Sequence, residues 1–67
     1  MPFDAPRYDY APQWRSQLAC ERDLHAWAIA DARAVRRPAA KAAALRRAAV
    51  HRANAVHYAA KLRRIGA

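Results

Sequence analysis

The placement of glycine and proline limits what this chain can fold into. Gly66 is the only glycine among 67 residues, and the four prolines are Pro2, Pro6, Pro12 and Pro38. Glycine costs a helix interior about 1 kcal/mol relative to alanine, and proline costs more. Alanine, the strongest helix former, occurs twenty times. The pattern therefore predicts an all-α chain with long, uninterrupted helices.

Residues 1–13 are expected to form an extended N-terminal arm. Its three prolines remove backbone donors and disfavour helical geometry in the residues that precede them. Aromatic side chains recur in and just after this stretch, at Phe3, Tyr8, Tyr10 and Trp14. Because so short a segment cannot form a core of its own, these aromatics favour packing on the helices or insertion into another molecule.

The segment 14–37 carries the first predicted helix, from about Pro12 to about Arg36, with Asp9 or Ala11 near its cap. Apolar residues follow one face, with Ile29 at its border, at Trp14, Leu18, Leu24, Ala28, Ala32 and Val35. Glu21 and His25 lie in the same stripe. Their ionisable groups must be satisfied by each other, by a basic group from elsewhere or by solvent.

The segment 38–67 carries a second helix, expected from about Ala39 to Ile65, with Gly66 as its C-terminal stop. Its expected contact stripe consists of Ala42, Leu45, Ala49, Ala53, Val56 and Ala60. A second apolar edge contains Ala44, Ala48, Ala55, Tyr58 and Leu62. Arg52 projects between the two edges, where pairing with Glu21 or Asp31 of the first helix would hold a hairpin in register.

The joint before Pro38 allows two architectures. A two-helix hairpin would bury both stripes, whereas a Pro-kinked helix would leave them for other molecules. The small side chains of the second helix complement the larger ones of the first, which favours the hairpin.

The size of the chain makes an additional source of stability necessary. A domain of this length buries only about 60% of the surface that its unfolded chain exposes. Cys20 is the only cysteine, so no internal disulfide can form. Self-association as a homo-oligomer, or docking on a larger partner, is the expected remedy.

Several function classes are not indicated by the sequence. His51 and His57 are six positions apart and face different directions on a helix, so neither a metal site nor a cofactor is expected. No nucleophile with an activating base is recognisable, which predicts a protein that is not an enzyme. No apolar run approaches the roughly 18 residues of a membrane span, and no signal-peptide pattern is present. We therefore expect a cytoplasmic protein without a membrane partner.

Charge is distributed very unevenly along the chain. All five carboxylates lie within residues 1–31, whereas residues 32–67 contain ten Lys or Arg residues and no Asp or Glu. These segments carry about −2 and +10, which sum to the net charge of +8. A helix with so much uncompensated charge repels itself unless an anionic partner accepts it.

Two binding functions follow as hypotheses. The first is association with nucleic acid or a nucleoprotein complex, because basic groups spaced along a helix can follow a phosphate backbone. The residues expected to bind are Arg33, Arg36, Arg37, Arg46, Arg47, Asn54, His57, Lys61 and Arg64. The alternative is an accessory or inhibitory subunit that binds a larger protein through a helical face and the arm aromatics Phe3, Tyr8, Tyr10 and Trp14.

Overall fold

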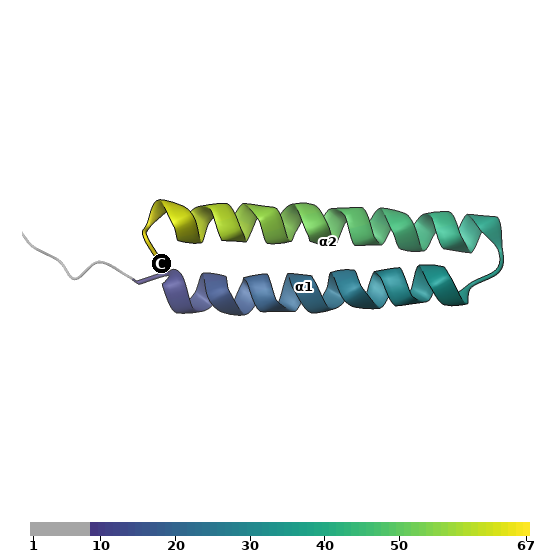
Figure 1. Cartoon of the computed structure of the whole chain (residues 1–67), viewed down its shortest axis with the longest axis horizontal. Coiled ribbons are helices and arrows are strands. Elements are labelled where there is room, and N and C mark those ends of the chain that lie inside the picture. The colour runs from purple at the N-terminus through teal and green to yellow at the C-terminus, as the bar shows by residue number, and fades with distance from the viewer. Residues whose placement is uncertain (1–8) are drawn as a thin grey trace, which may run out of the picture.

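The computed structural model describes residues 9–67, which form two antiparallel helices joined at one end (Figure 1). Helix α1 comprises Ala11–Ala34 and helix α2 comprises Pro38–Arg64. The predicted all-α hairpin is confirmed, and α2 folds back along α1 rather than continuing as a kinked rod. Most of the predicted arm, residues 1–8, lies outside the described residues, and residues 11–13 belong to α1 rather than to an extended segment.

The starts of both helices follow from local chemistry. Asp9 Oδ1 accepts a hydrogen bond from the Ala11 N–H at 3.0 Å and so satisfies a backbone donor at the beginning of α1. Arg37 is extended, with ψ at 127°, because the ring of Pro38 disfavours helical geometry in the residue before it. Pro38 therefore ends the connection and begins α2 instead of kinking a continuous helix.

Gly66 ends α2 in the expected way. It adopts a positive φ of 73°, where a side chain would strain the backbone. Its N–H donates to the Arg63 carbonyl at 3.1 Å, and the Ala67 N–H donates to the Leu62 carbonyl at 2.9 Å. These two bonds form a Schellman motif, which satisfies carbonyl groups that the last helical turn leaves open.

The predicted face of α1 is the one that packs against α2. Its buried and half-buried seam positions alternate three and four residues apart, at Ala11, Trp14, Leu18, Glu21, His25, Ala28, Ala32 and Val35. The same alternation occurs along α2, at Ala44, Ala48, His51, Ala55, Tyr58 and Leu62. Such spacing is the heptad repeat of a coiled-coil seam, here formed between two antiparallel helices of one chain.

The predicted contact stripe of α2 is wrong. Leu45 and Val56 of that stripe remain 49% and 60% exposed, while the second apolar edge supplies the contact face. Both edges consist mainly of alanine, so the periodicity of α2 alone does not indicate which of them contacts α1. The second edge also places Tyr58 in the interface and His51 opposite Glu21, which gives a half-buried carboxylate a partner.

The hairpin has a narrow core of small side chains. The buried apolar residues among positions 9–67 are Ala11, Ala28, Ala32, Ala44, Ala48 and Leu62. Alanine allows close approach of the helices but buries little area, and burial stabilises by only about 25 cal/mol per Å². Interactions at the ends and along the seam therefore contribute a large share of the stability of this fold.

Candidate nucleic-acid interface

A polar cluster lies in the middle of the helix interface. Glu21 Oε2 is 2.6 Å from His51 Nδ1, and Glu21 Oε1 accepts a hydrogen bond from Asn54 Nδ2 at 3.3 Å. The side chains of Glu21 and His51 are only 14% and 25% exposed. Asn54, predicted as a nucleic-acid contact, is thus a half-buried residue that engages α1, and the cluster favours one register of the hairpin.

The predicted pairing of Arg52 with an α1 carboxylate is wrong. Glu21 pairs with His51 and Asn54, and Asp31 pairs with Arg47. Arg52 follows His51 by one position, or about 100° around the helix, so its side chain leaves the seam on the other side of α2. There it lines a surface hollow together with His25 and Arg22.

Arg47 is the one predicted nucleic-acid contact that forms an ion pair within the described part of the chain. Its Nη2 lies 2.8 Å from Asp31 Oδ2, and the two side chains are 53% and 56% exposed. Exposed pairs of this kind contribute about 0–1 kcal/mol. Water and salt compete for the pair, so this guanidinium can exchange its carboxylate for another anion at little cost.

A group of cations surrounds the connection between the helices. Arg36 and Arg37 lie in the connection itself, Arg33 in the last turn of α1 and Lys41 in the first turns of α2. All four are exposed, and no carboxylate between residues 32 and 41 balances them. The connection lies at the end of the hairpin opposite to the C-terminus (Figure 1). These four cations make that end strongly electropositive.

The remaining predicted nucleic-acid contacts on α2 differ in their exposure. Arg46, His57 and Arg64 are exposed. Lys61 is half-buried, and its Nζ lies 5.1 Å from the centre of the Trp14 ring and 5.8 Å from that of Tyr58. These distances are typical of cation–π contacts, so Lys61 partly closes the open end of the hairpin.

The predicted protein-binding aromatics are only partly within the described residues. Phe3 and Tyr8 lie outside them. The rings of Tyr10 and Trp14 are stacked with centres 5.4 Å apart, and Tyr10 is 48% exposed while Trp14 is half-buried in α1. Trp14 thus contributes to the hairpin interface, and Tyr10 presents aromatic surface beside it.

The carboxylates of residues 9–67 leave the excess of positive charge largely uncompensated. Asp9 accepts from the Ala11 N–H at the start of α1, Glu21 is held in the seam and Asp31 pairs with Arg47, while Asp23 is exposed. Of the ten Lys and Arg residues between positions 32 and 67, only Arg47 forms an ion pair with a carboxylate in the described chain, which leaves nine that do not.

Two features of the helix interface and its border were not predicted from the sequence. The first is the role of His51, whose partner lies thirty positions away in the chain. The spacing of three and four residues that links Ala44, Ala48, His51 and Ala55 could have indicated it. The second is a hollow beside the seam, which depends on how α1 and α2 are rotated against each other.

No three His, Cys, Asp or Glu side chains among positions 9–67 gather closely enough to hold a metal ion. Neither α1 nor α2 is sufficiently long and apolar to cross a lipid bilayer.

Comparisons of the chain with protein-family models, with curated proteins and with solved structures find no significant match.

Proposed function

We propose that this protein is a small, non-enzymatic binding module that associates with nucleic acid, alone or within a nucleoprotein complex. The observation that carries the proposal is the set of nine Lys and Arg residues in positions 32–67 without a carboxylate partner in the described chain. An ordinary solvated helix face mixes both signs of charge. A rigid surface with cations of one sign attracts polyanions and releases their counterions on binding.

The arrangement of these cations supports contact with an extended polyanion. Lys41 and Arg64 are separated by 23 positions of one continuous helix, or about 35 Å at 1.5 Å per residue. Arg33, Arg36 and Arg37 add charge at the connection, and Arg46 lies between the two ends. Since Lys41, Arg46 and Arg64 lie on one continuous helix, little backbone conformational entropy is lost when a partner binds them.

Binding to fluorescently labelled duplex DNA of about two helical turns, and to single-stranded RNA, tests the proposal by anisotropy. With about five phosphates contacted, log affinity for the duplex should fall with log salt at a slope of about −4 to −5. Affinity that does not change between low and physiological salt would contradict the proposal.

A matched pair of variants separates the proposed surface from net charge. Arg46→Gln with Arg64→Gln should weaken binding and make the salt slope less steep by about 1–2. Arg15→Gln with Arg22→Gln removes the same charge from exposed positions of α1 and should have a smaller effect. Equal effects of the two variants would show that only total charge matters and would remove the assignment to α2.

The second candidate function is an accessory or inhibitory subunit that docks on a larger protein through the arm. The half-exposed ring of Tyr10, stacked on Trp14 at the open end of the hairpin, favours it, because such aromatics are common anchors of interfaces. Deleting residues 2–8 tests this function and leaves the hydrogen bond from the Ala11 N–H to Asp9 intact. Partner binding that survives this deletion would eliminate the role of that segment.

A further inference from the structure

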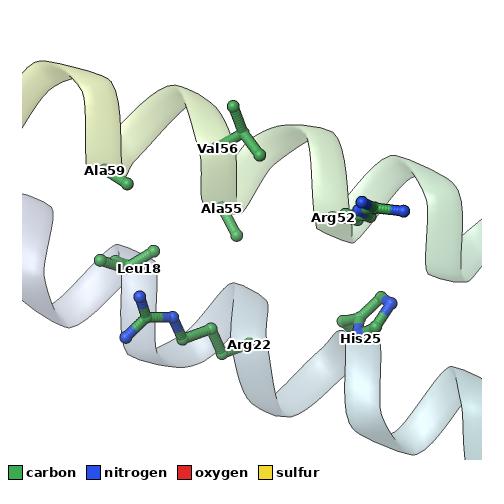
Figure 2. Close-up of a pocket in the computed structure, with 7 residues that line it drawn as sticks. All are labelled: Leu18, Arg22, His25, Arg52, Ala55, Val56 and Ala59. Carbon is green, nitrogen blue, oxygen red and sulfur yellow. The ribbon is translucent and has the colours of Figure 1, made fainter.

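Beside the helix seam runs a surface depression that we call the lateral groove. Helix α1 contributes Leu18, Arg22, His25 and Ile29, and α2 contributes Leu45, Arg52 and Val56. Two adjoining hollows share His25, Arg52 and Val56 and so form one continuous groove. Figure 2 shows one of these hollows, with Leu18 and His25 directed toward α2 and Ala55 and Ala59 directed toward α1. The guanidinium groups of Arg22 and Arg52 are directed toward its opposite ends.

Most of the residues that line the lateral groove are apolar, and much of this surface is exposed. Leu45 and Val56 are 49% and 60% exposed, and Leu18 and Ile29 are half-buried on the facing helix. The exposed parts of these aliphatic side chains add little to the stability of the hairpin itself. Covering them would bury apolar area that the alanine core does not supply.

The dimensions of the lateral groove suit a third helix. Leu18 and Ile29 are eleven positions apart on α1, which corresponds to about 16 Å or three helical turns. An amphipathic helix with apolar residues at spacings of three and four places its anchors along that length. A helix in this position would complete a three-helix bundle, in which each seam lies between two neighbours.

The charges that line the lateral groove define the chemistry of its occupant. Arg22 and Arg52 contribute two guanidinium groups and His25 an imidazole, whereas none of the lining residues in the described chain is Asp or Glu. A second copy of this chain would bring the same cations against each other, which opposes self-association through this face. Carboxylates that flank an apolar stripe would instead pair with these groups.

We propose that the lateral groove binds an amphipathic helix of another protein, one with Leu-like side chains on one stripe and Glu or Asp on both flanks. The proposal goes beyond nucleic-acid binding and uses a different surface, since none of the groove residues is among those expected from the sequence to contact phosphates. Arg52 is the one groove residue that also belongs to the nine cations without a carboxylate partner in the described chain. A chain that binds nucleic acid with α2 and an acidic helix in the lateral groove would link the two partners.

A synthetic peptide of about three heptads tests the proposal, with Leu at positions a and d and Glu at e and g, which prevents pairing of the peptide with itself. Binding of the labelled peptide to the full chain is measured by anisotropy at physiological salt. Leu45→Ala with Val56→Ala should weaken binding by about tenfold. Val50→Ala with Ile65→Ala is the matched control, because these side chains are 57% and 50% exposed and lie outside the lateral groove.

Charge reversal provides the second arm of the test. Arg22→Glu with Arg52→Glu should weaken binding of the Glu peptide and strengthen binding of a peptide with Lys at e and g. Arg46→Glu with Arg64→Glu changes the net charge equally and should not produce this exchange of preference. Circular dichroism verifies that every variant remains helical, and the alanine variants preserve helix propensity.

Three outcomes would overturn the proposal. One is an equal weakening of peptide binding by the groove variants and by their matched controls, which would show that the lateral groove is not the binding site. Another is that the peptide does not bind to the chain at all. The third is a dimer of the chain, detected by sedimentation, that the double variant Leu45→Ala with Val56→Ala dissociates. The occupant of the lateral groove would then be a second copy of the chain. None of these measurements involves nucleic acid. Their failure would therefore not bear on the proposal of nucleic-acid binding, which is tested separately.

Discussion

Replacing Glu21 by alanine should destabilise the hairpin far more than its single lost charge suggests. Glu21 accepts from Asn54 and contacts His51 in the helix interface. Its removal leaves the half-buried polar side chains of His51 and Asn54 on α2 without this partner. The penalty therefore comes from the groups that remain, not from the carboxylate that is lost.

The magnitude follows from the exposure of the partners. A buried polar group without a partner costs about 1–3 kcal/mol. Because His51 is 25% exposed, water replaces part of the lost interaction, which brings the expected loss to about 1–2 kcal/mol. A protein of this size has a total stability of about 3–10 kcal/mol, so the change is a considerable fraction of it.

Urea denaturation followed by the helical circular dichroism signal measures the effect. With an m-value near 1 kcal/mol/M, the midpoint should fall by about 1–2 M. Asp31→Ala is the control, because it also replaces an α1 carboxylate by alanine but breaks only the exposed pair with Arg47, worth about 0–1 kcal/mol. A double-mutant cycle between Glu21→Ala and His51→Ala should give a coupling free energy of about 0.5–3 kcal/mol.

Two results would contradict this expectation: an equal shift of the midpoint by Glu21→Ala and Asp31→Ala, or a double-mutant cycle without coupling. Either result would mean that the pair at 2.6 Å does not differ energetically from an exposed one.

Two further perturbations test the packing and the helix end. Ala44 is 0% exposed in the seam, so Ala44→Leu should overpack the interface and destabilise by about 1–3 kcal/mol, whereas Ala42→Leu on the exposed side should stay within about 0.5 kcal/mol; thermal denaturation compares the two, and equal melting temperatures would contradict the close helix contact at Ala44. Gly66→Ala should cost about 1 kcal/mol through its positive φ alone, since nothing lies within 4 Å of the added Cβ. Gly66→Asn should lose less because Asn tolerates this conformation, and urea midpoints that rank the two variants the other way would count against the backbone explanation.

Most of the hairpin could be predicted from residue types alone. The prolines and Gly66 mark the ends of two helices within one or two residues of those observed, at Ala11–Ala34 and Pro38–Arg64. The contact face of α1 was also readable, because Trp14, Leu18 and Leu24 are large enough to mark a stripe. Local propensities and side-chain size are properties of short segments, so no knowledge of the partner helix is required.

The contact face of α2 could not be predicted in the same way. Its two apolar edges consist mainly of alanine and differ little in the free energy of burial. The actual seam contains His51, a polar residue whose place there is explained by Glu21 opposite to it. A pattern search that rewards only apolar residues therefore favours the edge with Leu45 and Val56, which the structure leaves exposed.

The sequence by itself determined the helices, their ends and the excess of positive charge in residues 32–67, because each depends on residue type and position along the chain. Only the tertiary structure decided which carboxylates are engaged, which cations remain without one and where the lateral groove lies. These depend on the rotation and register of α1 against α2. That register is selected by many weak interactions between residues far apart in the sequence, such as Glu21 and His51, which are thirty positions apart. A pattern within one short segment does not contain such interactions.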